Sequence, residues 1–202
     1  MFATLIASAT LLGQRGWPEV PSLAPRWTAG GAHWSRWEGT VGKARVRTFV
    51  KMEPTTWAKG IPYWWDQVRP RPADAYHFEE FRTMSWYVKR IVIEERGRWT
   101  AYDVGSRFKL TGLPYETAQL HRGKGTEIIL QLGDAGGAYA VILPVSATGL
   151  SRLAWGSTEQ EMSEVRAQQL RLKRRIPVQT VSQSEREALT RASRLADKRK
   201  GL

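Results

Sequence analysis

Imidazoles are the side chains of this sequence best suited to acid–base or metal chemistry, and there are three of them, His33, His77 and His121. His77 and Glu80 are three residues apart, so on a helix both would lie on one face and could share a metal ion. No third ligand accompanies them, and neither a His-Glu-x-x-His nor a Gly-x-Ser-x-Gly motif occurs. The absence of cysteine excludes thiolate ligands, disulfides and cysteine nucleophiles. We therefore predict no catalytic residue, no metal site and no cofactor.

Residues 43–52 offer a different chemistry, because basic and apolar side chains alternate along them. Alternation predicts a strand with Ala44, Val46, Thr48, Val50 and Met52 toward a core. The opposite face would carry Lys43, Arg45, Arg47, Phe49 and Lys51. Such a surface can neutralise phosphates while its ring stacks on a base. The alternative is a solvated strand face whose cations deter edge-to-edge aggregation.

Residues 53–72 form a second basic and aromatic stretch, which Pro54, Pro62, Pro70 and Pro72 keep extended. Four of its side chains are predicted to bind nucleic acid or an acidic protein partner: Trp64, Trp65, Arg69 and Arg71. The aromatic rings would stack or anchor, and the arginines would pair with anions.

The C-terminal region is predicted to contain two helices. Ser157 or Thr158 caps the first, which would run to the basic residues before Pro177. The second begins at Ser182, with Glu185 as its capping-box partner. Four cations of the first helix are expected to contact a polyanion: Arg171, Lys173, Arg174 and Arg175. A solvated pair of helices is the alternative.

The middle of the chain predicts the core. Residues 86–95 and 98–104 read as paired strands across Arg96-Gly97, and residues 127–132 and 138–143 as a hairpin across a Gly-rich link. These segments predict a mostly antiparallel sheet of roughly five to seven strands.

The N-terminal region differs from this core. Residues 2–13 are apolar but shorter than the about 20 residues of a membrane span, and no Lys or Arg precedes them as in a signal peptide. We expect a packed strand or a docking arm there. Residues 16–42 contain four tryptophans without periodicity, which indicates an irregular arm that grips a neighbour.

Together these features predict an α+β fold in three parts: a Trp/Pro-rich arm (residues 1–42), a β-rich core (43–150) and a basic helical extension (151–202). The sequence has 31 Lys and Arg against 19 Asp and Glu, a net charge of +12, which favours polyanionic partners. We expect a non-enzymatic component of a nucleic-acid-containing particle, a virion rather than a ribosome-like assembly, with nucleic acid and neighbouring subunits as partners and no membrane span. The alternatives are a metal-dependent nucleic-acid-processing enzyme and a secreted glycan or cell-wall binder.

Overall fold

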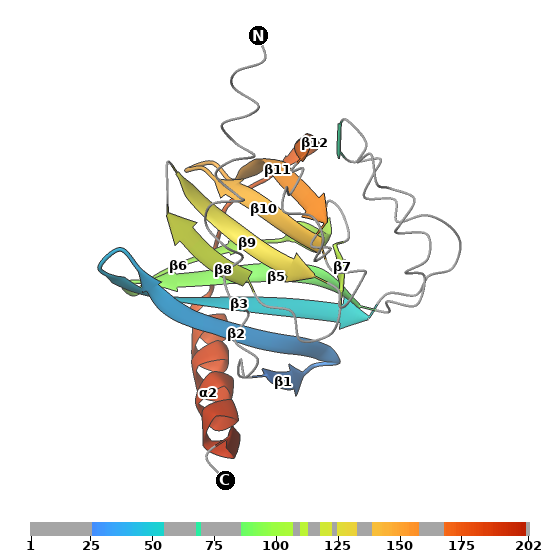
Figure 1. Ribbon diagram of the computed structural model, residues 1–202. Helices are drawn as coiled ribbons and strands as arrows, with labels where there is room; N and C mark the ends of the chain where they lie inside the picture. The colour runs from blue at the N-terminus through green and yellow to red at the C-terminus, as the bar shows by residue number, and fades with distance from the viewer. Residues whose placement is uncertain are drawn as a thin grey trace.

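Two antiparallel sheets and one C-terminal helix make up the protein in a computed structural model (Figure 1). The structure describes residues 26–54, 68–69, 86–106, 110–112, 118–122, 125–132, 139–157 and 168–200. The first sheet has the order β1-β2-β3-β5-β6-β13, with β7 beside β5. Its strands are β1 (Arg26–Ala29), β2 (Ala32–Val41), β3 (Ala44–Pro54), β5 (Trp86–Glu95), β6 (Arg98–Tyr102), β7 (Thr111–Gly112) and β13 (Gln179–Thr180).

The second sheet has the order β4-β12-β11-β10-β9-β8. Its strands are β4 (Val68–Arg69), β8 (Ala118–Arg122), β9 (Thr126–Leu132), β10 (Tyr139–Val145), β11 (Leu150–Ser157) and β12 (Gln168–Ile176). A 3₁₀ turn covers Val104–Ser106, and helix α2 covers Gln183–Lys200. The mostly antiparallel β-structure predicted from the sequence is confirmed, but it forms two sheets rather than one.

Both predicted hairpins of the core are confirmed. β9 pairs with β10, and β5 pairs with β6 across Arg96-Gly97. The φ angles of 51° at Arg96 and 77° at Gly97 are the positive values that a two-residue hairpin turn needs. The turn thereby sets the register that aligns Glu94 with Trp99.

The core lies between the two sheets and takes side chains from both. The alternation predicted for β3 is correct, because Ala44, Val46, Thr48, Val50 and Met52 are at most 2% exposed. The four apolar residues among them pack with the inward residues of β9, β10, β11 and β12. The hydroxyl of Thr48 donates to the carbonyl of Ala118, which satisfies a buried polar group and joins β3 to β8.

Two predicted elements are wrong in the part of the chain that the structure describes. The predicted irregular arm includes residues 26–41, which form β1 and β2, while residues 1–25 lie outside the described residues. Residues 168–176 of the predicted first C-terminal helix form the strand β12 instead, where Leu170 and Ile176 are buried in the core and β11 supplies an edge to pair with, while residues 158–167 lie outside the described residues. Burial in a sheet therefore outweighs the local sequence pattern that favours a helix at these residues.

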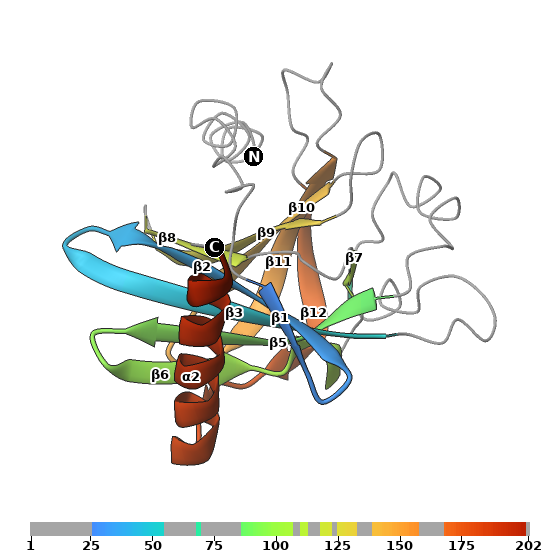
Figure 2. The same ribbon diagram turned by 90° about the horizontal axis from the view of Figure 1, so that it is seen from below.

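Helix α2 begins where the sequence predicts. The backbone N–H of Glu185 donates to the hydroxyl of Ser182 at 3.2 Å, which is the first half of a capping box. The helix crosses the outer face of the first sheet, the face away from the second sheet (Figures 1 and 2). A second apolar cluster forms at this contact, from Trp34, Phe49, Val92, Ala101, Val181 and Leu189.

Candidate nucleic-acid interface

The basic side chains of β3 lie on the outer face of the first sheet, where α2 also packs. The carboxylate of Glu38 on β2 accepts a hydrogen bond from Arg45 and forms an ion pair with it, and the carboxylate of Glu94 on β5 accepts a hydrogen bond from Arg47 at 2.8 Å. Both glutamates are aligned with β3 by strand pairing, since Glu38 and Glu94 each stand opposite Arg47. The sheet therefore neutralises two of the predicted phosphate ligands itself.

Lys51 is neutralised in the same way by a residue of its own strand. Its ammonium lies 2.8 Å from a carboxylate oxygen of Glu53, whose other oxygen accepts a hydrogen bond from the Tyr87 hydroxyl at 3.1 Å. Burial raises the pKa of Glu53, but Lys51, Tyr87 and Lys89 outweigh it, so this pKa lies below its ordinary value. Glu53 is thus anionic at neutral pH and competes with any phosphate for Lys51. Phosphate binding by Arg45, Arg47 and Lys51 stays a prediction.

Phe49 does not lie on the surface, and its predicted availability for stacking on a base is wrong. Its exposure is 0%. The ring stacks on Trp99 at 5.8 Å between centroids and meets Trp27 edge-on at 6.3 Å. Sequence alternation correctly assigned Phe49 to the outer face, but it could not show that α2 covers the middle of that face.

Two arginines of the first sheet fix α2 at its two ends. Near the helix start, Arg90 makes a bidentate contact with Glu185 at 3.0 and 3.1 Å and also contacts Asp103. Near its end, Arg36 makes a bidentate contact with Asp197, both distances 3.0 Å. Bidentate guanidinium–carboxylate pairs fix orientation as well as position.

The environment of Arg90 favours its charged form. Burial alone would lower the pKa of Arg90, but the hydrogen bonds and charges of Asp103 and Glu185 outweigh this, so the pKa lies above its ordinary value. Arg90 is therefore a structural cation of the helix–sheet contact, and the carboxylates around it leave no site for a phosphate.

A second group of cations lies on the second sheet, around an irregularity between β11 and β12. Leu150 stands opposite Ile176 and Arg152 opposite Arg171, so β11 advances two residues while β12 advances five. The extra residues of β12 bulge out of the pairing and carry consecutive basic side chains. We call the exposed cations at this place the β12 cluster: Arg152, Arg171, Lys173, Arg174 and Arg175.

Gly149 makes this arrangement possible. It has a φ of 118°, and a Cβ at this position would collide with the backbone carbonyl of Ile176. The close approach lets the Arg175 guanidinium donate to the Thr148 hydroxyl at 2.9 Å. The end of β12 is thereby held against the turn that precedes β11.

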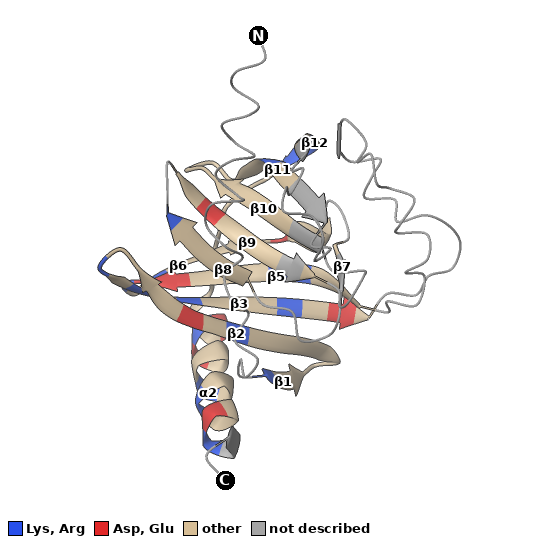
Figure 3. Cartoon of the chain, viewed as in Figure 1, with Lys and Arg blue, Asp and Glu red and all other residues tan. Residues whose placement is uncertain are grey.

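The β12 cluster has no carboxylate partner among the described residues: none of its five cations lies within 4.0 Å of one. Figure 3 shows its blue positions at one end of the molecule, on the described part of β12. The β3 cations, by contrast, lie among red positions on neighbouring strands. Unpaired cations close together on one surface are the arrangement that attracts a polyanion.

Of the remaining predicted site residues, Arg69 lies in β4, directly opposite Arg171 of β12. The fold thus brings together two predicted cations that are about a hundred residues apart in the sequence. Lys43 is exposed in the turn between β2 and β3, while Trp64, Trp65 and Arg71 lie outside the described residues. Arg152 was missed, because a single arginine in a strand carries no signal until its neighbours are known.

The described parts of the chain contain no group of three or more side chains that could hold a metal ion, and no helix that could cross a membrane. His77 and Glu80, the pair considered for metal binding, lie outside those parts. Comparison with protein-family models, with curated proteins and with solved structures gives no match to this chain.

Proposed function

We propose that this protein is a non-enzymatic structural or assembly component of a nucleic-acid-containing particle, and that it contacts the phosphate backbone through the β12 cluster. The observation that carries the proposal is the contrast between two basic surfaces. The cations of β3 already have carboxylate partners, whereas those of the β12 cluster have none among the described residues. The net charge of +12 adds a general attraction to the same partner.

The arrangement of the β12 cluster suits backbone contact rather than base recognition. Four of its cations follow one another along residues 171–175, and the fifth, Arg152, stands opposite Arg171. Arginine forks pair with phosphate oxygens in a bidentate manner, and a lysine adds a point charge. Contacts of this kind bind any sequence, as a packaging or assembly protein requires.

The salt dependence of oligonucleotide binding tests the proposal. Each phosphate that the protein neutralises on duplex DNA contributes about 0.9 to the slope of log affinity against log salt. For the variant with Lys173, Arg174 and Arg175 replaced by glutamine, we expect a slope that is smaller by about 2.7, because three contacts are lost. Fluorescence anisotropy with a labelled duplex at several salt concentrations measures both slopes.

The matched control is the variant Arg191→Gln/Arg194→Gln/Lys198→Gln, which removes the same charge from α2. We expect its slope to stay close to that of the unaltered protein, since α2 lies at the opposite end of the molecule from β12 (Figure 1), and cations farther than a Debye length from the bound phosphates are largely screened. Equal slopes for the unaltered protein and the β12 variant would contradict the proposal, as would a larger change in the α2 variant.

A further inference from the structure

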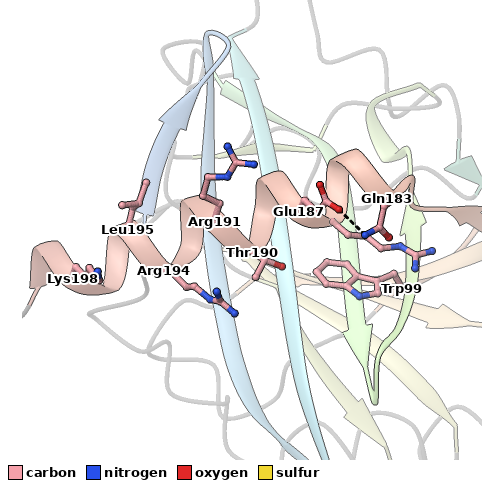
Figure 4. Close-up of a pocket in the computed structure, with 9 residues that line it drawn as sticks. Trp99, Gln183, Glu187, Thr190, Arg191, Arg194, Leu195 and Lys198 are labelled. Atoms are coloured by element: carbon pink, nitrogen blue, oxygen red, sulfur yellow. Dashed lines mark hydrogen bonds between the residues drawn. The ribbon is translucent and has the colours of Figure 1, made fainter.

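A groove of about 680 Å³ runs along α2 beside β6 (Figure 4). The tryptophan of β6, Trp99, lies at one end of it, and the helix supplies the rest of the lining. Of the four helix cations that line it, Arg186 donates to the carbonyl of Val181 at 2.9 Å, and the other three are Arg191, Arg194 and Lys198. Their spacing of three and four residues places them along one side of the helix, over about 10 Å.

These three cations are exposed and lie within 4.0 Å of no described carboxylate. The side of α2 that packs on the sheet is a different one, and it buries Leu189 and Ala196. The charge of the groove is therefore not needed to hold the helix in place. Arg36 and Arg90 perform that role through Asp197 and Glu185.

The groove also has an apolar component. Two large hydrophobic side chains are exposed among the described residues, and Leu195, at 55%, is the more exposed of the two. It stands between Arg194 and Lys198 on the same side of the helix and lines the groove with them. An exposed leucine beside cations that have no carboxylate partner among the described residues suits a ligand that presents apolar and anionic groups together.

We propose that this groove binds an acidic amphipathic segment of a partner protein. Carboxylates spaced by three or four residues on a partner helix would match the spacing of Arg191, Arg194 and Lys198. The apolar side chains of that helix would cover Leu195 and the exposed part of Trp99. This site is separate from the β12 cluster, and it does not depend on nucleic-acid binding there.

Nucleic acid suits the groove less well. A base needs an open aromatic face, but Trp99 already stacks on Phe49, and the guanidinium of Arg47 lies 5.9 Å from its ring centroid. The carboxylate of Glu187 also lines the groove, where it accepts a hydrogen bond from Gln183 at 2.7 Å. That carboxylate would repel a phosphate, whereas a peptide can place an apolar or donor group beside it.

The probe for this site is a fluorescein-labelled helical peptide with glutamates on one side and leucines at adjoining i and i+4 positions. We expect the full-length Arg191→Gln/Arg194→Gln/Lys198→Gln variant to bind it about tenfold more weakly, because three exposed ion pairs are lost. The variant Leu195→Asp should weaken binding as well. Circular dichroism of each variant reports whether α2 is intact.

The matched control is Lys173→Gln/Arg174→Gln/Arg175→Gln, which has the same net charge, and we expect it to change peptide affinity by no more than about twofold. Equal loss in both triple variants would overturn the proposal, since it would show general attraction to a basic protein. Loss of oligo(dT) affinity in the α2 variant, with peptide affinity unchanged, would also overturn it and would assign the groove to nucleic acid. Failure of oligonucleotide binding at the β12 cluster would leave the peptide result standing, so the two proposals fail separately.

Discussion

Replacement of Phe49 by alanine is expected to lower the free energy of unfolding by about 4 kcal/mol. The ring is 0% exposed and packs between Trp27 and Trp99, beneath α2. Truncation removes its apolar burial and leaves a cavity that the rigid sheet cannot fill. Because Phe49 lies in the contact between helix and sheet, α2 should lose much of its attachment.

Urea denaturation followed by circular dichroism measures this change. Phe49→Leu is the control, since it keeps most of the apolar volume and should cost less than half as much. An oligonucleotide-binding assay completes the test, because removal of a ring that stacked on bases would weaken oligonucleotide binding without lowering the free energy of unfolding. Unchanged stability of Phe49→Ala together with weakened oligonucleotide binding would contradict the buried position of the ring.

Replacement of Arg90 by methionine is expected to lower the free energy of unfolding by about 3 kcal/mol. The variant leaves the carboxylates of Glu185 and Asp103 without their shared partner, and methionine supplies no donor to either. Arg90 is only 16% exposed, so its replacement removes a largely desolvated pair. The two carboxylates are 27% and 29% exposed, and water can reach them in part, which keeps the effect at the lower end of the range for buried pairs.

A double-mutant cycle of Arg90→Met with Glu185→Gln isolates the pair, and we expect a coupling energy above about 1 kcal/mol. Arg36→Met is the matched control at the other end of α2, where one carboxylate, Asp197, accepts the bidentate contact. Arg36 also lies 3.6 Å from Glu38, but Glu38 keeps Arg45 as a partner, so only Asp197 loses its pair and Arg36→Met should destabilise less than Arg90→Met. A coupling energy near zero would mean that Arg90 does not fix the start of the helix.

Local sequence patterns predicted the inner strands, the turn between two of them and the start of the C-terminal helix. The alternation of residues 44–52, the Arg96-Gly97 turn and the Ser182 cap each depend on neighbours in sequence, and each is confirmed. β12 could not be predicted in this way. Its helix-like residues form a strand because β11 offers an edge and the core takes up Leu170 and Ile176, and both of these are tertiary effects.

The candidate site likewise has features that the local sequence predicts and features that only tertiary contacts decide. The sequence identified the cations of β3 and β12 as candidates but could not distinguish them. The difference lies in carboxylates that strand pairing and side-chain conformation place beside the β3 cations. Glu53 and Glu38 are close in sequence to Lys51 and Arg45, whereas Glu94 reaches Arg47 only through the pairing of β3 with β5. Helix α2, more than 130 residues after Phe49, likewise decides that this ring is buried.

Amide hydrogen exchange of the full-length chain, with and without a duplex oligonucleotide at low salt, is the most direct test of which basic surface meets a polyanion. We assign this contact to the β12 cluster, which has no carboxylate partner among the described residues, rather than to the β3 face. We predict slower exchange in residues 148–152 and 171–176 on binding, and unchanged exchange in residues 44–53. Protection confined to residues 44–53 would contradict this account, as would oligonucleotide binding that leaves exchange in β12 unaltered.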